Sequence, residues 1–174
     1  MTDSGVSRAE SCVVACAEAW RGAGEIMASP FGTIPSLAAR LAKLMFAPDL
    51  VLTDGEAALM VGAPAVSTPP DQLVREAVMT YRNVFDVVWS GRRHVMMGAS
   101  QLDKFGNQNF AFIGSHEAPR TQLLGMRGAP GNTINDITSY WIPAHTARVF
   151  VAAVDVVSGV GYDRARIDER RAAS

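Results

Sequence analysis

The residues with the clearest capacity for chemistry lie at positions 98–109, directly after a short apolar run. That run, Val95, Met96 and Met97, can be buried on both faces of a sheet and predicts a core strand. Gly98 then removes the side chain where the backbone leaves the strand, so that a ligand can approach the main chain. Residues 103–109 are rich in Asp, Asn and Gly, which favour tight turns. From spacing alone, a hairpin without a ligand is the simpler interpretation, since lone glycine-rich turns are weak evidence.

An acidic side chain, Glu56, follows another predicted strand. Residues 25–28 and 50–52 have the character of strands, and apolar positions between residues 34 and 45 recur at helical spacing. A strand, a helix and a strand in this order favour parallel pairing within one sheet. Ligands gather at the carboxyl ends of such strands, so a functional group is expected at residues 53–58, where Glu56 stands. A solvated loop carboxylate is the alternative interpretation.

The composition excludes several classes of function. The chain has 174 residues, of which 48% are hydrophobic and 19% charged, as expected for one globular domain. Its net charge of -1 gives no attraction to nucleic acid or to a membrane surface. We expect no metal, because the three histidines lack ligand spacing with cysteine or with each other. Cys12 and Cys16 stand four residues apart on a predicted helix, which indicates a reducing cytoplasmic setting.

The remaining segments complete an α/β fold with a mainly parallel sheet flanked by helices. Ser7 and Glu10 have the spacing of a capping box and predict the start of the first helix. We expect one domain over residues 7–163, between a disordered lead at 1–6 and a polar tail at 164–174. The other expected elements are a loop over 62–70, a helix over 71–82, a helix or strand over 84–89, strands over 110–113, 121–124, 140–142 and 148–153, and a glycine-rich loop over 125–132.

The order Gly-Ala-x-Gln-x-Asp-x-x-Gly-Asn-x-Asn at residues 98–109 resembles a turn in the beta subunits of class I coenzyme A transferases. The likeness runs from about Ser7 to Asp163. Within that superfamily the chain most resembles the beta subunits of actinobacterial steroid ring-opening CoA hydrolases. The matching segments outside the turn are residues 24–32, 47–52, 128–132, 138–141 and 154–162.

The resemblance implies a ligand site. The matching transferase dipeptide lies beside bound CoA, so Gly98 and Ala99 are expected against the acyl-thioester, with Gln101 and Asn107 supporting them. The loop with Gly131 and Asn132 would offer backbone N–H groups to an oxyanion. The family's nucleophilic glutamate aligns with Gly55, which leaves Glu56 one residue late and turned in another direction.

The resemblance also implies a function. It points to a beta subunit that pairs with an alpha subunit, as alpha2-beta2, and binds an acyl-CoA between them. The reaction expected is hydrolytic opening of the last ring of a steroid-derived CoA thioester, with coenzyme A as part of the substrate and no separate cofactor. The alternatives are a CoA transferase acting on a small oxo- or dicarboxylic acid, and a noncatalytic partner subunit. Chains of this family continue beyond the element at 154–162, so this one is expected to be shortened at its C-terminus.

A Gly98→Val substitution is expected to abolish ligand binding while leaving the fold intact, because the new side chain occupies the space of the backbone approach. The measurement is the dissociation constant of the assembled complex for an acyl-CoA, with circular dichroism as the control for folding. Unchanged affinity would contradict the placement of the thioester beside residue 98.

Overall fold

The computed structural model describes residues 5–54 and 57–162 and divides the chain into two compact units. Unit 1 contains Met1–Met97 and Asp136–Trp141, and unit 2 contains Gly98–Asn135 and Ile142–Ser174. The chain therefore passes from one unit to the other three times. Gly5 and Val6 are exposed, whereas the rest of the predicted lead and the polar tail lie outside the described residues.

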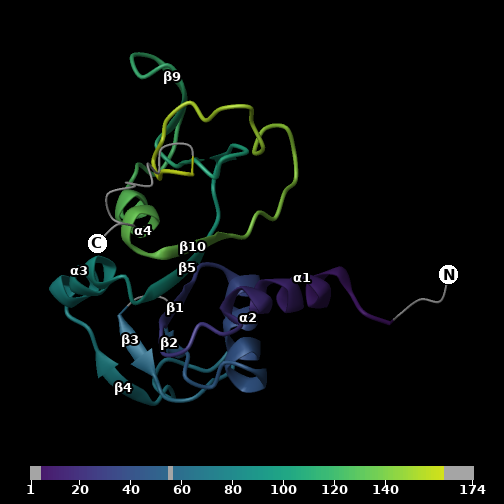
Figure 1. Cartoon of the computed structure of the whole chain (residues 1–174), viewed down its shortest axis with the longest axis vertical. Helices are drawn as coiled ribbons and strands as arrows, with labels where there is room; N and C mark the ends of the chain where they lie inside the picture. The colour runs from purple at the N-terminus through teal and green to yellow at the C-terminus, as the bar shows by residue number, and fades with distance from the viewer. Residues whose placement is uncertain (1–4, 55–56, 163–174) are drawn as a thin grey trace, which may run out of the picture. The chain divides into compact units, whose positions relative to one another are not determined.

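Unit 1 is built on a six-stranded sheet in the order β10-β5-β1-β2-β3-β4 (Figure 1). Its strands are β1 (Met27–Pro30), β2 (Val51–Thr53), β3 (Ala58–Met60), β4 (Arg75–Val78), β5 (Arg93–Met97) and β10 (Ile137–Tyr140). The neighbours β10, β5, β1 and β2 are parallel, and β3 and β4 continue the sheet in antiparallel pairs. The predicted α/β fold with a mainly parallel sheet is confirmed.

One face of this sheet packs against two helices. Helix α1 (Arg8–Ala17) begins with the predicted capping box between Ser7 and Glu10, and a short 3₁₀ helix, η1 (Glu18–Trp20), carries the fully buried Trp20. Helix α2 (Thr33–Met45) connects β1 to β2 as predicted. The buried core on this face is formed by Trp20, by alternate residues in and beside the strands, and by the alanines of α2. Its members include Trp20, Ile26, Ala28, Ala38, Ala39, Ala42, Leu50, Leu52, Met60 and Met96.

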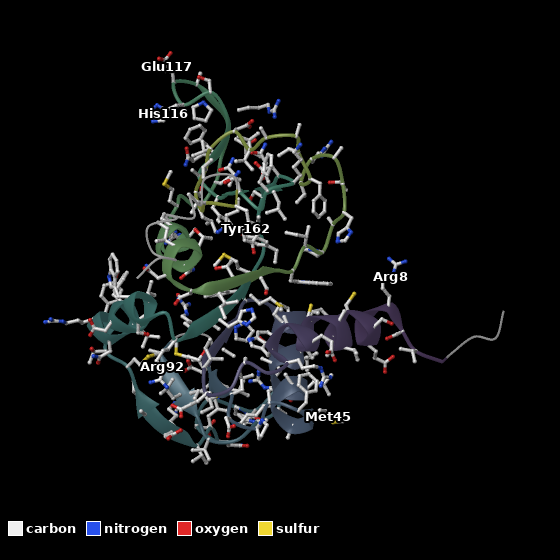
Figure 2. The ribbon with its side chains drawn as sticks, viewed as in Figure 1. Arg8, Met45, Arg92, His116, Glu117 and Tyr162 are labelled. Atoms are coloured by element: carbon white, nitrogen blue, oxygen red, sulfur yellow. The ribbon has the colours of Figure 1, made fainter. Side chains whose placement is uncertain are left out.

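The apolar pattern of α2 does not identify its buried side correctly. The pattern places Leu44 and Met45 on the apolar face, but they are 71% and 70% exposed, and Met45 projects from the end of the helix in Figure 2. Alanines take the core positions instead, because small side chains allow a helix to approach a sheet closely. Strand β1 also runs two residues further than predicted, so that Ser29 and Pro30 are buried strand residues.

The opposite face of the sheet carries helix α3 (Tyr81–Ser90), which starts at a Thr80–Asn83 capping box and ends at Gly91 with a φ of 69°. The helix predicted within residues 71–82 is wrong, since this segment forms the exposed strand β4 before α3 begins. The ambiguity at residues 84–89 resolves to helix. A four-residue strand in a charged, exposed sequence has no buried face, so no alternating pattern announces it.

Unit 2 contains two small antiparallel sheets and one short helix. Strands β6 (Gln101–Leu102) and β7 (Gln108–Asn109) form a hairpin, as the turn residues predicted, and β8 (Phe112–Gly114) pairs with β9 (Pro119–Gln122). Helix α4 (Ala129–Asn135) replaces the second half of the predicted glycine-rich loop, which is a correction. Residues 148–153 contribute an isolated bridge from Phe150 to Leu102 in place of the predicted strand. Within the described part of the chain, no helix is long and apolar enough to cross a membrane.

Strand β5 is buried over all five residues although it begins with two polar ones. His94 lies on the α1/α2 face, where its ring is 5.3 Å from that of Trp20 and its Nε2 is 2.8 Å from Ser139 Oγ. Burial lowers the pKa of His94 to about 4, because the positive imidazolium loses its hydration there. His94 is therefore neutral in the folded protein at neutral pH.

Replacing His94 with Gln should remove an acid-dependent loss of stability. A histidine whose folded pKa is depressed supports the fold above its unfolded pKa of 6.5 and loses that support as the pH falls through about 4. Over that window the parent protein should lose ~3 kcal/mol of unfolding free energy relative to His94→Gln. Urea unfolding at a series of pH values measures the difference.

The control is His116→Gln, which alters an exposed histidine. Its stability profile should follow that of the parent protein. Parallel profiles for the parent and His94→Gln would show that burial of His94 does not oppose its protonation.

Candidate functional site

The predicted ligand stretch is accessible at its first three residues and at the hairpin turn, where Lys104 and Phe105 are exposed. Strand β5 ends at Met97, and Gly98, Ala99 and Ser100 are half-buried, whereas the strand before them and Gln101 after them are buried. The Ser100 N–H donates to the Asn109 carbonyl, 3.2 Å away, which ties this segment to the hairpin. Gly98 and Ala99, which the resemblance places beside the ligand, are thus partly accessible within unit 2.

Gln101 is turned into unit 2 and its amide is fully used there. Its Oε1 accepts hydrogen bonds from Asn109 Nδ2 at 2.7 Å and from the Asp155 N–H at 3.0 Å, and its Nε2 donates to Asp155 Oδ2 at 3.2 Å. The same Asp155 oxygen accepts from the Gly114 N–H at 2.8 Å. Because Gln101 is only 5% exposed, it positions the hairpin and does not present its amide to a ligand.

Asn107 holds the turn of the hairpin in the same way. Asp103 Oδ1 accepts from the N–H groups of Phe105 and Asn107, and its Oδ2 accepts from Asn107 Nδ2 at 3.0 Å. Asn107 Oδ1 in turn accepts from the Gly161 N–H at 2.7 Å. The expected supporting role of Asn107 has a structural basis, and its amide, like that of Gln101, faces protein.

Close backbone packing explains two glycines near the end of the described chain. A Cβ atom on Gly161 would lie 2.6 Å from the Asn107 nitrogen, and one on Gly159 would lie 2.9 Å from Thr133 Cγ2. Both distances are shorter than real Cβ contacts, so only glycine fits without a shift of the hairpin. The sequence marks these glycines only as part of the matching segment at residues 154–162, and their role follows from packing.

Gln108 is buried beside Gly159 and is a different case. Its side chain is fully buried, and neither Nε2 nor Oε1 has a hydrogen-bond partner among the described residues. An unpaired buried amide costs free energy, so this residue weakens unit 2. No feature of the described chain explains why an amide stands there.

Gly131 and Asn132 lie inside α4 and not in an open loop. The Asn132 N–H donates to the Gly128 carbonyl at 3.0 Å, which leaves it unable to stabilise an oxyanion. The Gly131 carbonyl accepts from Asn135 Nδ2 at 3.1 Å. The prediction of an exposed glycine loop here is wrong, because two residues in left-handed conformation, Gly125 and Arg127, turn the chain into a helix.

Gly55 and Glu56 lie outside the described residues, so the candidate nucleophile stays a prediction. The chain on either side is held by Asp54, whose Oδ1 accepts from the N–H groups of Ala57 and Ala58 at 3.1 and 3.0 Å. This four-residue connection joins β2 to β3 directly. Glu56 therefore belongs to a short connection at the carboxyl end of a parallel strand, where α/β sheets bind ligands.

A buried ion pair in unit 1 was missed by sequence reasoning. Arg93 is 8% exposed, with its Nε donating to Ser29 Oγ at 2.9 Å and its Nη1 at 3.9 Å from Asp136 Oδ2. Burial raises the pKa of Asp136 to about 6, against the opposing pull of Arg93. Its neighbour Arg92 instead reaches Glu25 at the surface. The only sequence signal was an arginine directly before an apolar run.

The geometry defines what the described part of unit 2 can do. The polar side chains of Gln101, Asp103, Asn107 and Asn109 stabilise the hairpin, and Gly98 and Ala99 beside it are half-buried. Among residues 5–54 and 57–162, no cluster of three or more His, Cys, Asp or Glu side chains is arranged to hold a metal ion.

Known proteins share this arrangement. No protein-family model matches the chain. The IpdB subunit of the cholesterol ring-cleaving hydrolase of Rhodococcus jostii RHA1 is 56% identical over 159 residues, which cover 91% of this chain and 62% of that subunit. One of the subunits of the 3-oxoadipate CoA-transferase of Pseudomonas knackmussii is 32% identical over 136 residues, covering 74% of this chain and 52% of the relative. The crystal structure of R. jostii IpdAB superposes with a TM-score of 0.88 at 55% identity, over 93% of this chain and 64% of that one.

The chain belongs to the coenzyme A transferase superfamily. It spans about three fifths of the length of the hydrolase subunit that it matches. The family resemblance on residues 98–109 and the coenzyme A transferase fold are both confirmed. The polar residues of the superfamily motif are Gln101, Asp103, Asn107 and Asn109. In this structure their side chains form the hydrogen bonds that stabilise the hairpin.

Replacing Gln101 with Ala should destabilise the protein by ~2 kcal/mol, because the buried Asn109 amide and the part-buried Asp155 N–H lose an acceptor. Chemical unfolding followed by a probe in unit 2 measures the change. The matched control is Gln72→Ala, which truncates an exposed glutamine and should shift stability by less than ~0.5 kcal/mol. Equal effects of the two substitutions would show that the Gln101 network adds nothing.

Proposed function

We propose that this chain is a beta subunit of a heteromeric hydrolase that opens the last ring of a steroid-derived bicyclic CoA thioester. The observation that carries the proposal is the 56% identity, over 91% of the chain, with the IpdB subunit of a cholesterol ring-cleaving hydrolase. At this level of identity, the half-exposed Gly98–Ala99 backbone would meet the same class of ligand. Coenzyme A enters as part of the substrate, and no separate cofactor is proposed.

The proposed reaction is a retro-Claisen hydrolysis. Water adds to the ring ketone beta to the thioester, and the bond between that carbon and the alpha carbon breaks. The electron pair passes to the thioester enolate, which takes up a proton, and the former ketone becomes a carboxylic acid. A base must remove the proton of the attacking water, but the enzyme forms no covalent bond to the substrate.

The sequence at residues 53–58 supports hydrolysis over transfer. Coenzyme A transfer by this superfamily needs a glutamate that forms a mixed anhydride with the acyl group, and Gly55 stands at that position. Glu56 stands one residue after that position in the sequence, and a carboxylate displaced by one residue would need a compensating backbone shift to act as the nucleophile. We place the general base in the alpha chain, since none of the polar motif side chains described in unit 2 is directed away from the protein.

The assembly proposed is an alpha2-beta2 complex in the cytoplasm, with the acyl-CoA bound between the two kinds of subunit. The close superposition on R. jostii IpdAB supports an assembly with a second kind of chain. The unpaired thiols of Cys12 and Cys16 support a reducing compartment. Neither nucleic acid nor a membrane is a proposed partner.

Incubating the reconstituted pair with an acyl-CoA and a free acid acceptor separates the two chemistries. Hydrolysis predicts release of ring-opened product without exchange of coenzyme A onto the acceptor, and no enzyme adduct trapped by hydroxylamine or borohydride. Glu56→Gln should then leave turnover within about threefold of the parent, because a change below ~1 kcal/mol excludes a covalent role. A trapped adduct that disappears in Glu56→Gln would overturn the proposal.

Two other functions have an observation in their favour. A class I CoA transferase acting on a small oxo- or dicarboxylic acid, with Glu56 as nucleophile, is favoured by the 32% identity to a 3-oxoadipate CoA-transferase chain. A noncatalytic partner subunit is favoured by the inward orientation of Gln101 and Asn107. If the chain only completes its partner's pocket, replacing Glu56, Gln101 and Asn107 by Ala should leave turnover and binding of the assembled complex unchanged, and a loss of either would exclude this function.

A further inference from the structure

A groove of about 450 Å³ opens between α3 and the adjacent strands of the unit 1 sheet. Its floor is apolar and its rim carries the exposed Glu25–Arg92 ion pair and Asp86. The lining residues from the strands and from α3 that the argument uses are Ile26, Met27, Val51, Leu59, Met79 and Val87.

The groove exists because this face of the sheet is only partly covered. Six strands spaced ~4.8 Å apart place the outer two ~24 Å from each other, whereas a single helix is ~10 Å wide. Among the described residues of unit 1, the opposite face carries α1 and α2, but this one carries α3 alone (Figure 1). Sheets that are mainly parallel bury both faces under helices, so this layer has room for one further helix.

The helix α3 is itself incompletely packed. Val88 is buried, but Tyr81, Phe85 and Trp89 follow one another at i, i+4 and i+8 and are 83%, 43% and 74% exposed. The edge strand β4 beyond the groove also exposes Val78 and the preceding Val74. Large apolar side chains gathered around a groove mark a surface that another polypeptide covers.

The length of the R. jostii subunit indicates which polypeptide covers the groove. The match with the R. jostii subunit leaves more than a third of that subunit without a counterpart here. We propose that the groove beside α3 is the docking site for an apolar-faced helix from that remaining part of the family's chain. The helix would pack along α3 across β1, β2 and β3 and complete the second helical layer.

The test joins the residues of the R. jostii subunit that have no counterpart here to the corresponding end of this chain, and compares this chimera with the chain alone. Hydrogen exchange of segments 25–27 and 83–90 should slow at least tenfold in the chimera. Val87→Lys, inside the groove, should restore fast exchange in the chimera and change the chain alone little. The matched control is Leu44→Lys on the other face, a leucine that is 71% exposed, which should have no effect in either protein.

A second measurement needs only the chain itself. An uncovered groove should bind the apolar dye ANS, and Val87→Lys should lower that fluorescence several-fold while Leu44→Lys does not. Equal exchange in the chain and the chimera, or dye binding insensitive to Val87→Lys, would overturn the proposal. A homodimer of the chain that Val87→Lys dissociates would also overturn it, because the groove would then belong to a second copy.

Discussion

The burial of strand β5 is the constraint on which unit 1 depends. All five of its residues lie inside, between β1 and β10, yet Arg93 and His94 carry groups that must keep partners without water. Successive residues point to opposite faces, so each polar group needs a different solution. His94 is kept neutral against Trp20 and Ser139, whereas Arg93 stays near Asp136 and Ser29. The return of the chain from unit 2 through β10 supplies two of these partners, which ties the fold of residues 136–141 to the chemistry of β5.

Internal pairing of polar groups also governs the hairpin that follows β5. Asp103, Asn107, Gln101 and Asp155 satisfy one another's donors and acceptors within unit 2, and glycine at 161 lets the last described segment pack against the turn. Pairing of this kind is stiff, because breaking any member leaves a buried group unpaired. The stiffness has a functional reading for a thioester enzyme: a ligand that meets only backbone at Gly98 and Ala99 requires that backbone to be held in one place.

The two faces of the unit 1 sheet differ in how completely they are covered. On the α1/α2 face, the alanines of α2 and the Trp20 side chain pack closely against alternate residues of the strands. The α3 face mixes Met27 and Val51 with the polar Ser29, Thr53 and Arg93, and it leaves a groove. The IpdB subunit from R. jostii is 56% identical over 91% of this chain, and it is considerably longer than this chain.

The sequence by itself determined the parallel β1-α2-β2 unit, the capping box at Ser7, the core strand at residues 95–97 and the hairpin at 103–109. These features depend on local pattern and turn chemistry, which neighbours in sequence encode. Tertiary structure decided that alanines and not Leu44 face the core, that 75–78 is an edge strand, and that Gly131 and Asn132 sit in a helix. It also decided which groups reach Arg93, Gln101 and Asn107, because Asp136, Asp155 and Gly161 lie 43 to 54 residues away along the chain. Contacts at that separation exist only after folding, so no local pattern of side chains announces them.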